Sequence, residues 1–138
     1  MYNPKVNYVR YADDFIITGE FEEVLENEVL PIVKEFMGER GLELSEDKTV
    51  ITNIYKGFDF LGCNIRKYGD KLLTKPSKKN INTFLKKCRG TIKACKATQQ
   101  SVLINRLNPM IRGWVDFHKH NVAYNAFKYV DYQIFKAL

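Results

Sequence analysis

Two adjacent aspartates, Asp13 and Asp14, stand between two apolar segments and are the residues best suited to chemistry. The flanking segments, residues 6–11 and 15–18, are rich in β-branched and aromatic side chains, which favour strands. A tight hairpin prefers Asn-Gly or Asp-Gly at its turn, and exceptions to such local rules tend to mark functional sites. Carboxylates at a hairpin tip can bind Mg²⁺, which also takes substrate phosphates as ligands. The alternative is an ordinary polar turn, because aspartate tolerates turn conformations well.

The charge of the 138-residue chain is divided between its two halves. Residues 1–55 hold 5 Lys and Arg against 12 Asp and Glu, a net charge of −7, whereas residues 56–138 hold 17 against 4, a net charge of +13. Eleven basic residues and no acidic residue lie between Lys71 and Val115. Solubilising surfaces normally interleave both signs, so this segment favours nucleic acid as its partner. An anionic membrane fits less well, because the basic segment lacks an exposed aromatic face.

The cysteines and histidines give no sign of a metal or disulfide framework. Cys63, Cys88 and Cys95 form no C-x-x-C pair, and we expect small core residues or free thiols. His118 and His120 are two residues apart, so they point to different sides of a helix and do not predict a zinc site. Because no stretch approaches the roughly 20 apolar residues of a membrane span and the start lacks a signal-peptide run, we expect a soluble intracellular protein.

The elements that position the aspartates are expected to be a hairpin followed by a helix. Apolar residues at helical spacing predict an amphipathic helix over residues 21–40, with Gly41 as its stop and Pro31 kinking it or opening its second half. The residues on its apolar face are Leu25, Val29, Ile32, Val33 and Phe36. Residues 49–54 and 58–65 are strand candidates separated by a turn at 55–57, and another short pair flanks residues 68–70.

The character of the sequence changes near Pro76, after which a three-helix bundle is expected. Ser77 is a suitable N-cap for the first helix. The residues expected on its buried face are Ile81, Phe84, Leu85, Cys88, Ile92 and Cys95. A second helix should start near Gln99 and break or kink at Asn108-Pro109. A third should begin near Ala123 and bury Phe127, Val130 and Ile134. The chain is therefore predicted to be α+β, with domains at residues 1–75 and 76–138.

Four segments, in order along the chain, resemble the reverse transcriptases of group II introns. Residues 11–14 (YADD) resemble the catalytic hairpin, and residues 41–49 (GLELSEDKT) resemble the helix-to-strand element that follows it. Residues 58–63 (FDFLGC) resemble the primer-grip hairpin, and residues 107–114 (LNPMIRGW) are similar to the maturase thumb signature. The resemblance implies the end of a polymerase palm, including the primer grip, over residues 1–75. It implies a helical thumb, the maturase domain, over residues 76–138.

The resemblance assigns roles to particular residues. It implies that Asp13 binds the two Mg²⁺ ions of nucleotidyl transfer and that Asp14 supports the site. Lys48 matches the lysine that neutralises or protonates pyrophosphate, although an ordinary surface lysine is an equal alternative. The primer grip corresponds to residues 60–62, that is Phe60, Leu61 and Gly62, where glycine permits close approach of the primer backbone. The alternative for these three is a plain core strand with a glycine bulge.

The expected partners are intron or template RNA, an RNA/DNA primer duplex and dNTP. We expect nucleic-acid contacts at an aromatic residue and eight basic residues; contacts of basic side chains to phosphate give affinity without sequence specificity. These residues are Tyr11, Lys75, Lys78, Lys79, Lys86, Lys87, Arg89, Lys93 and Arg112. Trp114 and Ile111, within the thumb signature, are expected in the core.

Nothing in the sequence matches the fingers or the first half of the palm, which carry another metal-binding aspartate in this family. The isolated chain is therefore expected to be inactive as an RNA-directed DNA polymerase. A separate fingers-palm chain or a homodimer would complete the site. The alternative function is a non-catalytic RNA-binding maturase module that assists intron splicing. Either way, we expect association with nucleic acid in a bacterial or organellar compartment.

Overall fold

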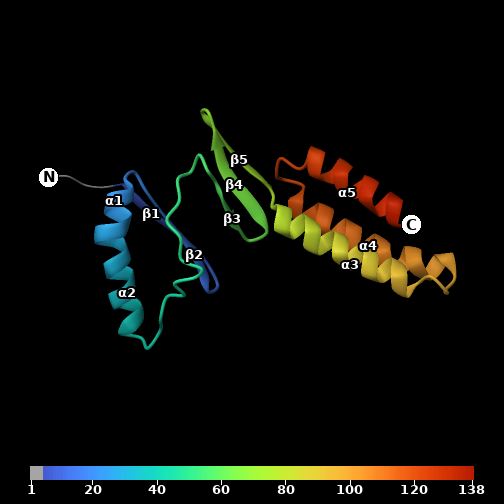
Figure 1. The fold of residues 1–138 in the computed structure, drawn as a ribbon, viewed down its shortest axis with the longest axis horizontal. Coiled ribbons are helices and arrows are strands. Elements are labelled where there is room, and N and C mark those ends of the chain that lie inside the picture. The colour runs from blue at the N-terminus through green and yellow to red at the C-terminus, as the bar shows by residue number, and fades with distance from the viewer. Residues whose placement is uncertain (1–4) are drawn as a thin grey trace. The chain divides into compact units, whose positions relative to one another are not determined.

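Helices and strands both contribute to the chain, which the computed structural model describes over residues 5–138 (Figure 1). One two-stranded and one three-stranded antiparallel sheet accompany the helices, so the predicted α+β class is confirmed. The chain divides into an N-terminal unit, up to Ile51, and a C-terminal unit, Thr52–Leu138. The expected functional boundary near residue 75 stays a prediction. Within residues 5–138, no helix has the length and apolar character needed to cross a membrane.

The N-terminal unit begins with the predicted hairpin. Strand β1 (Val6–Tyr11) pairs antiparallel with β2 (Asp14–Gly19), from Val6 opposite Gly19 to Tyr11 opposite Asp14. The pairing leaves Ala12 and Asp13 as a two-residue turn. The expected hairpin with aspartates at its tip is therefore confirmed.

A continuous helical segment follows the hairpin and contains a widened turn. It consists of α1 (Glu22–Val24), the π-helical turn η1 (Leu25–Val29) and α2 (Leu30–Gly38). The N–H of Leu30 donates to the carbonyl of Leu25, which is the wider spacing of a π-turn. The widened turn lies immediately before Pro31, whose ring removes a backbone donor and crowds the preceding turn.

A glycine in the left-handed conformation closes the C-terminal end of this helical segment. Gly41 adopts a φ of +67°, and the N–H of Leu42 donates to the carbonyl of Met37 over 2.9 Å. A left-handed residue that closes the last turn in this way is the common glycine C-terminal motif. The predicted stop at Gly41 is confirmed.

The apolar face of this helical segment is only partly covered within residues 5–138. Ile32 and Phe36 are 64% and 52% exposed, and no described residue before Thr52 is buried. The amphipathic pattern correctly predicted a helix, but these residues form no core of their own.

The strand expected over residues 49–54 is wrong. Ser45 instead accepts two hydrogen bonds from Thr49, from its N–H at 2.9 Å and its hydroxyl at 2.7 Å. A second turn follows, in which the carbonyl of Asn53 accepts from the N–H groups of Lys56 and Gly57. Local hydrogen bonds of Ser, Thr and Asn compete with strand pairing, and here they replace it.

The C-terminal unit opens with a three-stranded sheet of order β3 (Phe58–Phe60), β4 (Cys63–Tyr68), β5 (Lys71–Pro76). The expected single strand over residues 58–65 is therefore two strands joined at Leu61-Gly62. The pair expected around residues 68–70 is confirmed as β4 and β5.

Three helices complete the C-terminal unit, as predicted. They are α3 (Lys78–Ala94), α4 (Gln100–His118) and α5 (Tyr124–Ala137). Ser77 caps α3, because its hydroxyl accepts from the N–H of Asn80 over 3.1 Å. Of the break or kink expected at Asn108-Pro109, the break does not occur, since α4 is one 19-residue helix with the proline inside it; the kink stays a prediction.

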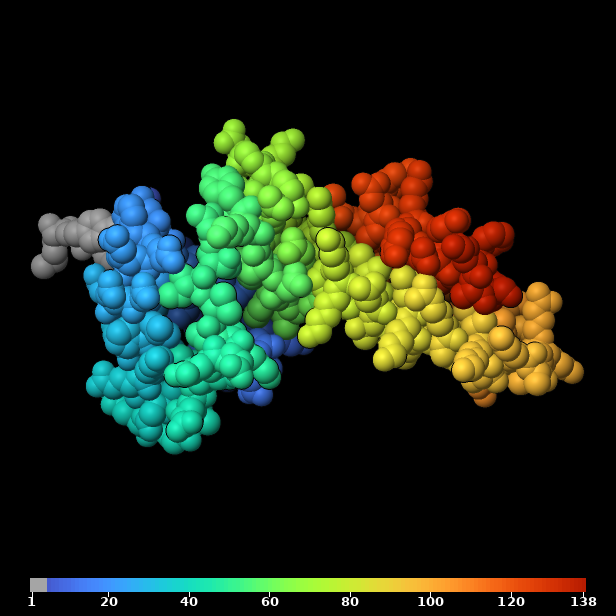
Figure 2. Space-filling model, viewed as in Figure 1, coloured from blue at the N-terminus to red at the C-terminus, as the bar shows by residue number. Residues whose placement is uncertain are grey.

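Trp114 organises the core between the three helices. Its ring stacks on Phe84 with centroids 4.8 Å apart and 6° between the planes, and it meets Phe127 edge-on at 5.5 Å. The expected buried faces of α3 and α5 contribute Leu85, Cys88, Ile92, Val130 and Ile134. In Figure 2 the surface of α5, in red, lies along that of α3, in yellow. The C-terminal unit therefore has a contiguous core.

Candidate nucleic-acid interface

The aspartate turn is a strained and exposed feature of the N-terminal unit. Ala12 has a φ of +51°, a conformation that side chains with a Cβ rarely adopt. The guanidinium Nε of Arg10 donates to the carbonyl of Ala12 over 2.7 Å. Asp13 occupies the turn, Asp14 begins β2, and both are exposed. A non-glycine residue held at positive φ agrees with the expectation that this turn departs from the local rule.

The carboxylate oxygens of Asp13 and Asp14 are suited to form part of a magnesium site. Carboxylate oxygens are the ligands that Mg²⁺ prefers, and a hairpin tip leaves them open to substrate phosphates. Among residues 5–138, no group of three or more acidic, histidine or cysteine side chains gathers as a metal site. Asp13 and Asp14 therefore need further ligands to hold two ions.

Two other predicted residues of the N-terminal unit are also open to solvent. Tyr11 ends β1 beside the aspartate turn and is 64% exposed. Lys48 is exposed in the turn after Ser45, to whose carbonyl its N–H donates over 3.1 Å. Its amine is thus available, and its role stays a prediction.

The predicted primer grip is a tight turn of the C-terminal unit. Leu61 and Gly62 have φ angles of +51° and +78°, the left-handed pair of a two-residue hairpin. A Cβ on Gly62 would lie 2.8 Å from the amide nitrogen of Asn80, so only glycine fits there. The carbonyl of Gly62 also accepts from the N–H of Ser77 over 3.0 Å. The turn therefore packs directly against the start of α3.

A buried polar network joins this hairpin to the helices. The side-chain oxygen of Asn80 accepts from the indole N–H of Trp114 at 2.8 Å and lies 3.0 Å from His118 Nε2. On the other side, the amide nitrogen of Asn121 lies 3.1 Å from His118 Nδ1 and 3.3 Å from the sulfur of Cys63. The network thus connects β4, α3, α4 and the loop before α5.

The donors and acceptors around His118 determine its protonation state. The Asn80 oxygen only accepts, so Nε2 carries the proton; the Asn121 amide nitrogen only donates, so Nδ1 is unprotonated. His118 is fully buried, and burial lowers its pKa below the ordinary 6.5. Burial also raises the pKa of the Cys63 thiol, which the hydrogen bond from Asn121 partly opposes. Both groups are therefore neutral and structural.

This network was not predicted from the sequence, although two residues of the sequence indicate it. Asn80 precedes Phe84 by four residues, and His118 follows Trp114 by four. Both polar residues therefore fall on the apolar faces of their helices, where a buried polar group needs a partner. The pattern could have identified these residues but not their common partner, because that contact joins distant parts of the chain.

The basic residues between Lys71 and Val115 lie along the C-terminal unit without acidic partners among the described residues. Within residues 5–138 the ion pairs are Arg40 with Glu39 and Lys119 with Asp116, so none involves a basic residue between Lys71 and Val115. Lys75 is half-buried, with its amine 4.6 Å from the centre of the Tyr68 ring. The other predicted phosphate-binding side chains of this unit are exposed, namely Lys78, Lys79, Lys86, Lys87, Arg89, Lys93 and Arg112. Their charge is therefore available to a polyanion.

Comparison with known families covers both units. Residues 1–65 match the reverse transcriptase (RNA-dependent DNA polymerase) family model, and residues 81–138 match the group II intron, maturase-specific domain. Together the two matches support a fragment of a group II intron reverse transcriptase/maturase.

A relative supports the same assignment to the group II intron reverse transcriptase and maturase family. A protein described as maturase-like protein 1 of Euglena gracilis is 27% identical over 120 residues, covering 84% of this chain. The chain spans about a quarter of that relative, since the match covers 25% of its length. The reverse transcriptase match contains the aspartate turn and the primer grip, and the maturase match contains Trp114 and His118.

Proposed function

We propose that this chain is the palm end and thumb of an RNA-directed DNA polymerase of the intron maturase type. In this proposal the C-terminal unit binds structured intron RNA and the template–primer duplex. The supporting observation is the run of eleven basic residues, between Lys71 and Val115, without an ion pair inside the described chain. An A-form duplex is recognised through its backbone and shape, for which unpaired lysines on a helical surface are suited.

Within this proposal the individual residues have distinct tasks. Asp13 holds metal at the turn, Asp14 supports it, and Lys48 neutralises the leaving pyrophosphate. Mg²⁺ supplies charge stabilisation at the reacting phosphates when bound. Residues 60–62 hold the primer backbone, while the basic side chains of the helices bind phosphates on the duplex.

We further propose that this chain alone does not extend a primer. The argument is the exposed pair of carboxylates at the turn, which is too small a ligand set for two ions and a nucleotide. A complementing fingers-palm chain or a second copy would have to supply the remaining ligand. The expected result with primer, RNA template, dNTP and Mg²⁺ is no extension by the chain alone; extension abolished by Asp13→Ala would contradict this proposal.

RNA binding by the chain is tested by filter binding to an intron RNA stem over a range of salt concentrations. Displacement of counterions by bound lysines makes the logarithm of affinity fall linearly with the logarithm of salt concentration. We expect a steep slope, reduced by roughly one for each phosphate-contacting lysine removed. The matched variants are Lys86→Ala and Lys87→Ala on α3, with Lys34→Ala in the acidic N-terminal unit as control. A flat salt dependence, or equal effects of all three variants, would rule the proposal out.

A further inference from the structure

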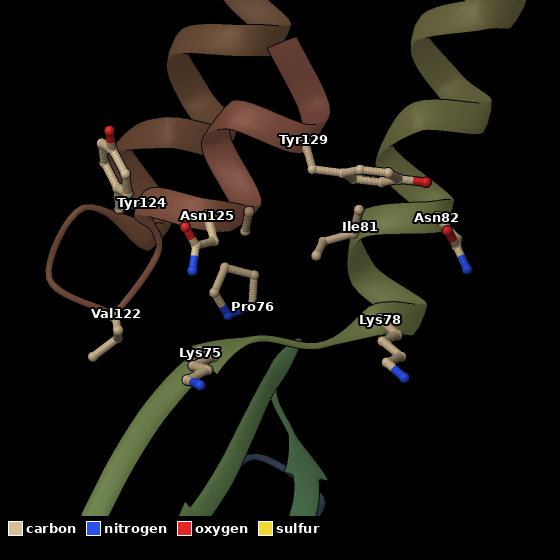
Figure 3. Close-up of a pocket in the computed structure, with 10 residues that line it drawn as sticks. Lys75, Pro76, Lys78, Ile81, Asn82, Val122, Tyr124, Asn125 and Tyr129 are labelled. Carbon is tan, nitrogen blue, oxygen red and sulfur yellow. The ribbon is translucent and has the colours of Figure 1, made fainter. Parts of the chain in front are cut away.

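A groove lies in the C-terminal unit between the end of β5, the start of α3 and the start of α5. Its volume is about 480 Å³, within the range of roughly 300–1,000 Å³ that small-molecule sites occupy. Figure 3 shows the ring of Tyr129 reaching from α5 towards Asn82 on α3, with Ile81 beneath it and Pro76 below. The groove is therefore a slot with an aromatic ring on one side and apolar side chains on the other.

Polar side chains at the groove's margins complement this apolar slot. Lys75 and Lys78 line the edge formed by β5 and α3 (Figure 3), and no acidic residue lines the groove. Neither lysine has an ion pair among the described residues. The side-chain amides of Asn82 and Asn125 also line it, and within residues 5–138 neither makes an intramolecular side-chain hydrogen bond.

The aromatic ring, the side-chain amides and the lysines of the groove match the parts of a nucleotide. A base stacks on an aromatic ring, its edges pair with amide donors and acceptors, and its phosphate binds lysine. We propose that the groove holds one unpaired nucleotide of an RNA strand, with its base against Tyr129 and its phosphate at Lys75 and Lys78. This inference rests on the proposed RNA-binding function and adds to it a preference for RNA with an unpaired base.

Two other occupants fit the groove less well. A peptide would gain little from two unneutralised lysines unless it were acidic, and it would fill the slot only if it also placed an aromatic side chain there, whereas a nucleotide carries the ring and the charge in one unit. A fully paired duplex would reach the lysines but not the slot, because its bases are stacked inside the helix. Charge and shape together therefore select a splayed-out nucleotide.

The test compares two RNA hairpins that differ by one bulged adenosine in the stem. Base stacking on an aromatic ring contributes about 1–3 kcal/mol, so the chain should bind the bulged hairpin about tenfold more tightly than the paired one. Tyr129→Ala should remove this preference and leave affinity for the paired hairpin within about twofold. Tyr129→Phe should keep the preference, because it keeps the ring.

Tyr132→Ala is the matched control for this experiment. Tyr132 is on the same helix and is 57% exposed against 49% for Tyr129, but it does not line the groove. This variant should keep the preference for the bulged RNA. Thermal melting of each variant by circular dichroism checks that the helices remain folded.

Each outcome decides between distinct conclusions. Equal affinity of the unaltered chain for both hairpins, or a preference that survives Tyr129→Ala, overturns this inference and leaves the proposed RNA binding intact. Binding to neither hairpin overturns both. Adenosine monophosphate is a third arm: displacement of the bulged RNA at micromolar concentration would assign the groove to a free nucleotide and overturn the inference.

Discussion

The two units of this chain differ in where their apolar side chains lie. In the C-terminal unit, Trp114, Leu85 and Val130 belong to one buried cluster. In the N-terminal unit no described residue is buried, and Ile32 and Phe36 stay exposed on the helical segment. Since burial of apolar surface is the main favourable term in folding, the C-terminal unit contains the source of its own stability. The N-terminal unit carries the predicted chemistry on a scaffold that needs further apolar cover.

The largest expected effect comes from truncating the central aromatic residue of the core. Trp114→Ala removes the stack on Phe84 and should destabilise the C-terminal unit by about 3–5 kcal/mol. Ile32→Ala, at an exposed apolar residue of the N-terminal unit, should change stability by less than about 0.5 kcal/mol. Urea denaturation measures both. Comparable losses in the two variants would show that the contrast between the units is wrong.

The second effect tests the polar network inside that core. Asn80→Ala leaves the Trp114 indole N–H and His118 Nε2–H without their acceptor, at a cost of about 2–4 kcal/mol. The control is Asn82→Ala on the exposed side of the same helix, which should be nearly neutral for stability. Thermal melting compares them, and a neutral Asn80→Ala would contradict the network.

The third prediction concerns how the stability of the folded chain depends on pH. The pKa of His118 is lowered in the folded chain and stays near 6.5 in the unfolded one, so below pH 6.5 the unfolded chain binds more protons. The stability contributed by neutral His118 is complete above pH 6.5 and falls as the pH drops below it. Urea midpoints at pH 7.5 and 5.5 should show this loss, and His118→Asn should reduce it. An identical pH response in the unaltered chain and in His118→Asn contradicts the assignment.

The smallest effects come from the two strained turns, one in each unit. Ala12 and Leu61 share a φ of +51°, so Ala12→Gly and Leu61→Asn should each relieve about 1 kcal/mol of backbone strain. In the C-terminal unit the relief should raise the melting temperature. In the N-terminal unit it should slow amide exchange in the hairpin. A lower melting temperature for Leu61→Asn would mean that its side-chain contacts outweigh the strain.

The local sequence pattern was sufficient to predict most helices and strands of this chain. Segments rich in β-branched and aromatic residues predicted the hairpin at Asp13, glycine predicted the stop at Gly41, and Ser77 predicted the start of α3. Pattern failed where local and long-range interactions compete. Residues 49–54 have strand-like composition, yet hydrogen bonds at Ser45 and Asn53 close turns there.

The sequence pattern also did not decide between a break and a kink at Pro109, because the effect of a proline on a helix depends on its surroundings. A proline removes one backbone hydrogen bond, but Leu107 and Trp114 on either side of it are buried in the same cluster. That burial holds α4 together through the proline. The assignments of Lys48 and residues 60–62 came from resemblance alone, that of Asp13 from its place at the hairpin tip as well, and their roles stay predictions.

The sequence by itself determined the charge division and most of the helical and strand segments, because these follow from residue types and their spacing; the family likeness came from the resemblance of four motifs. Only the tertiary structure determined that Asn80 lies against Gly62 and bonds Trp114 and His118. It alone brought Tyr129 and Lys78 to one groove. The physical reason is that such contacts join residues far apart in the chain, whose meeting depends on how the whole core packs.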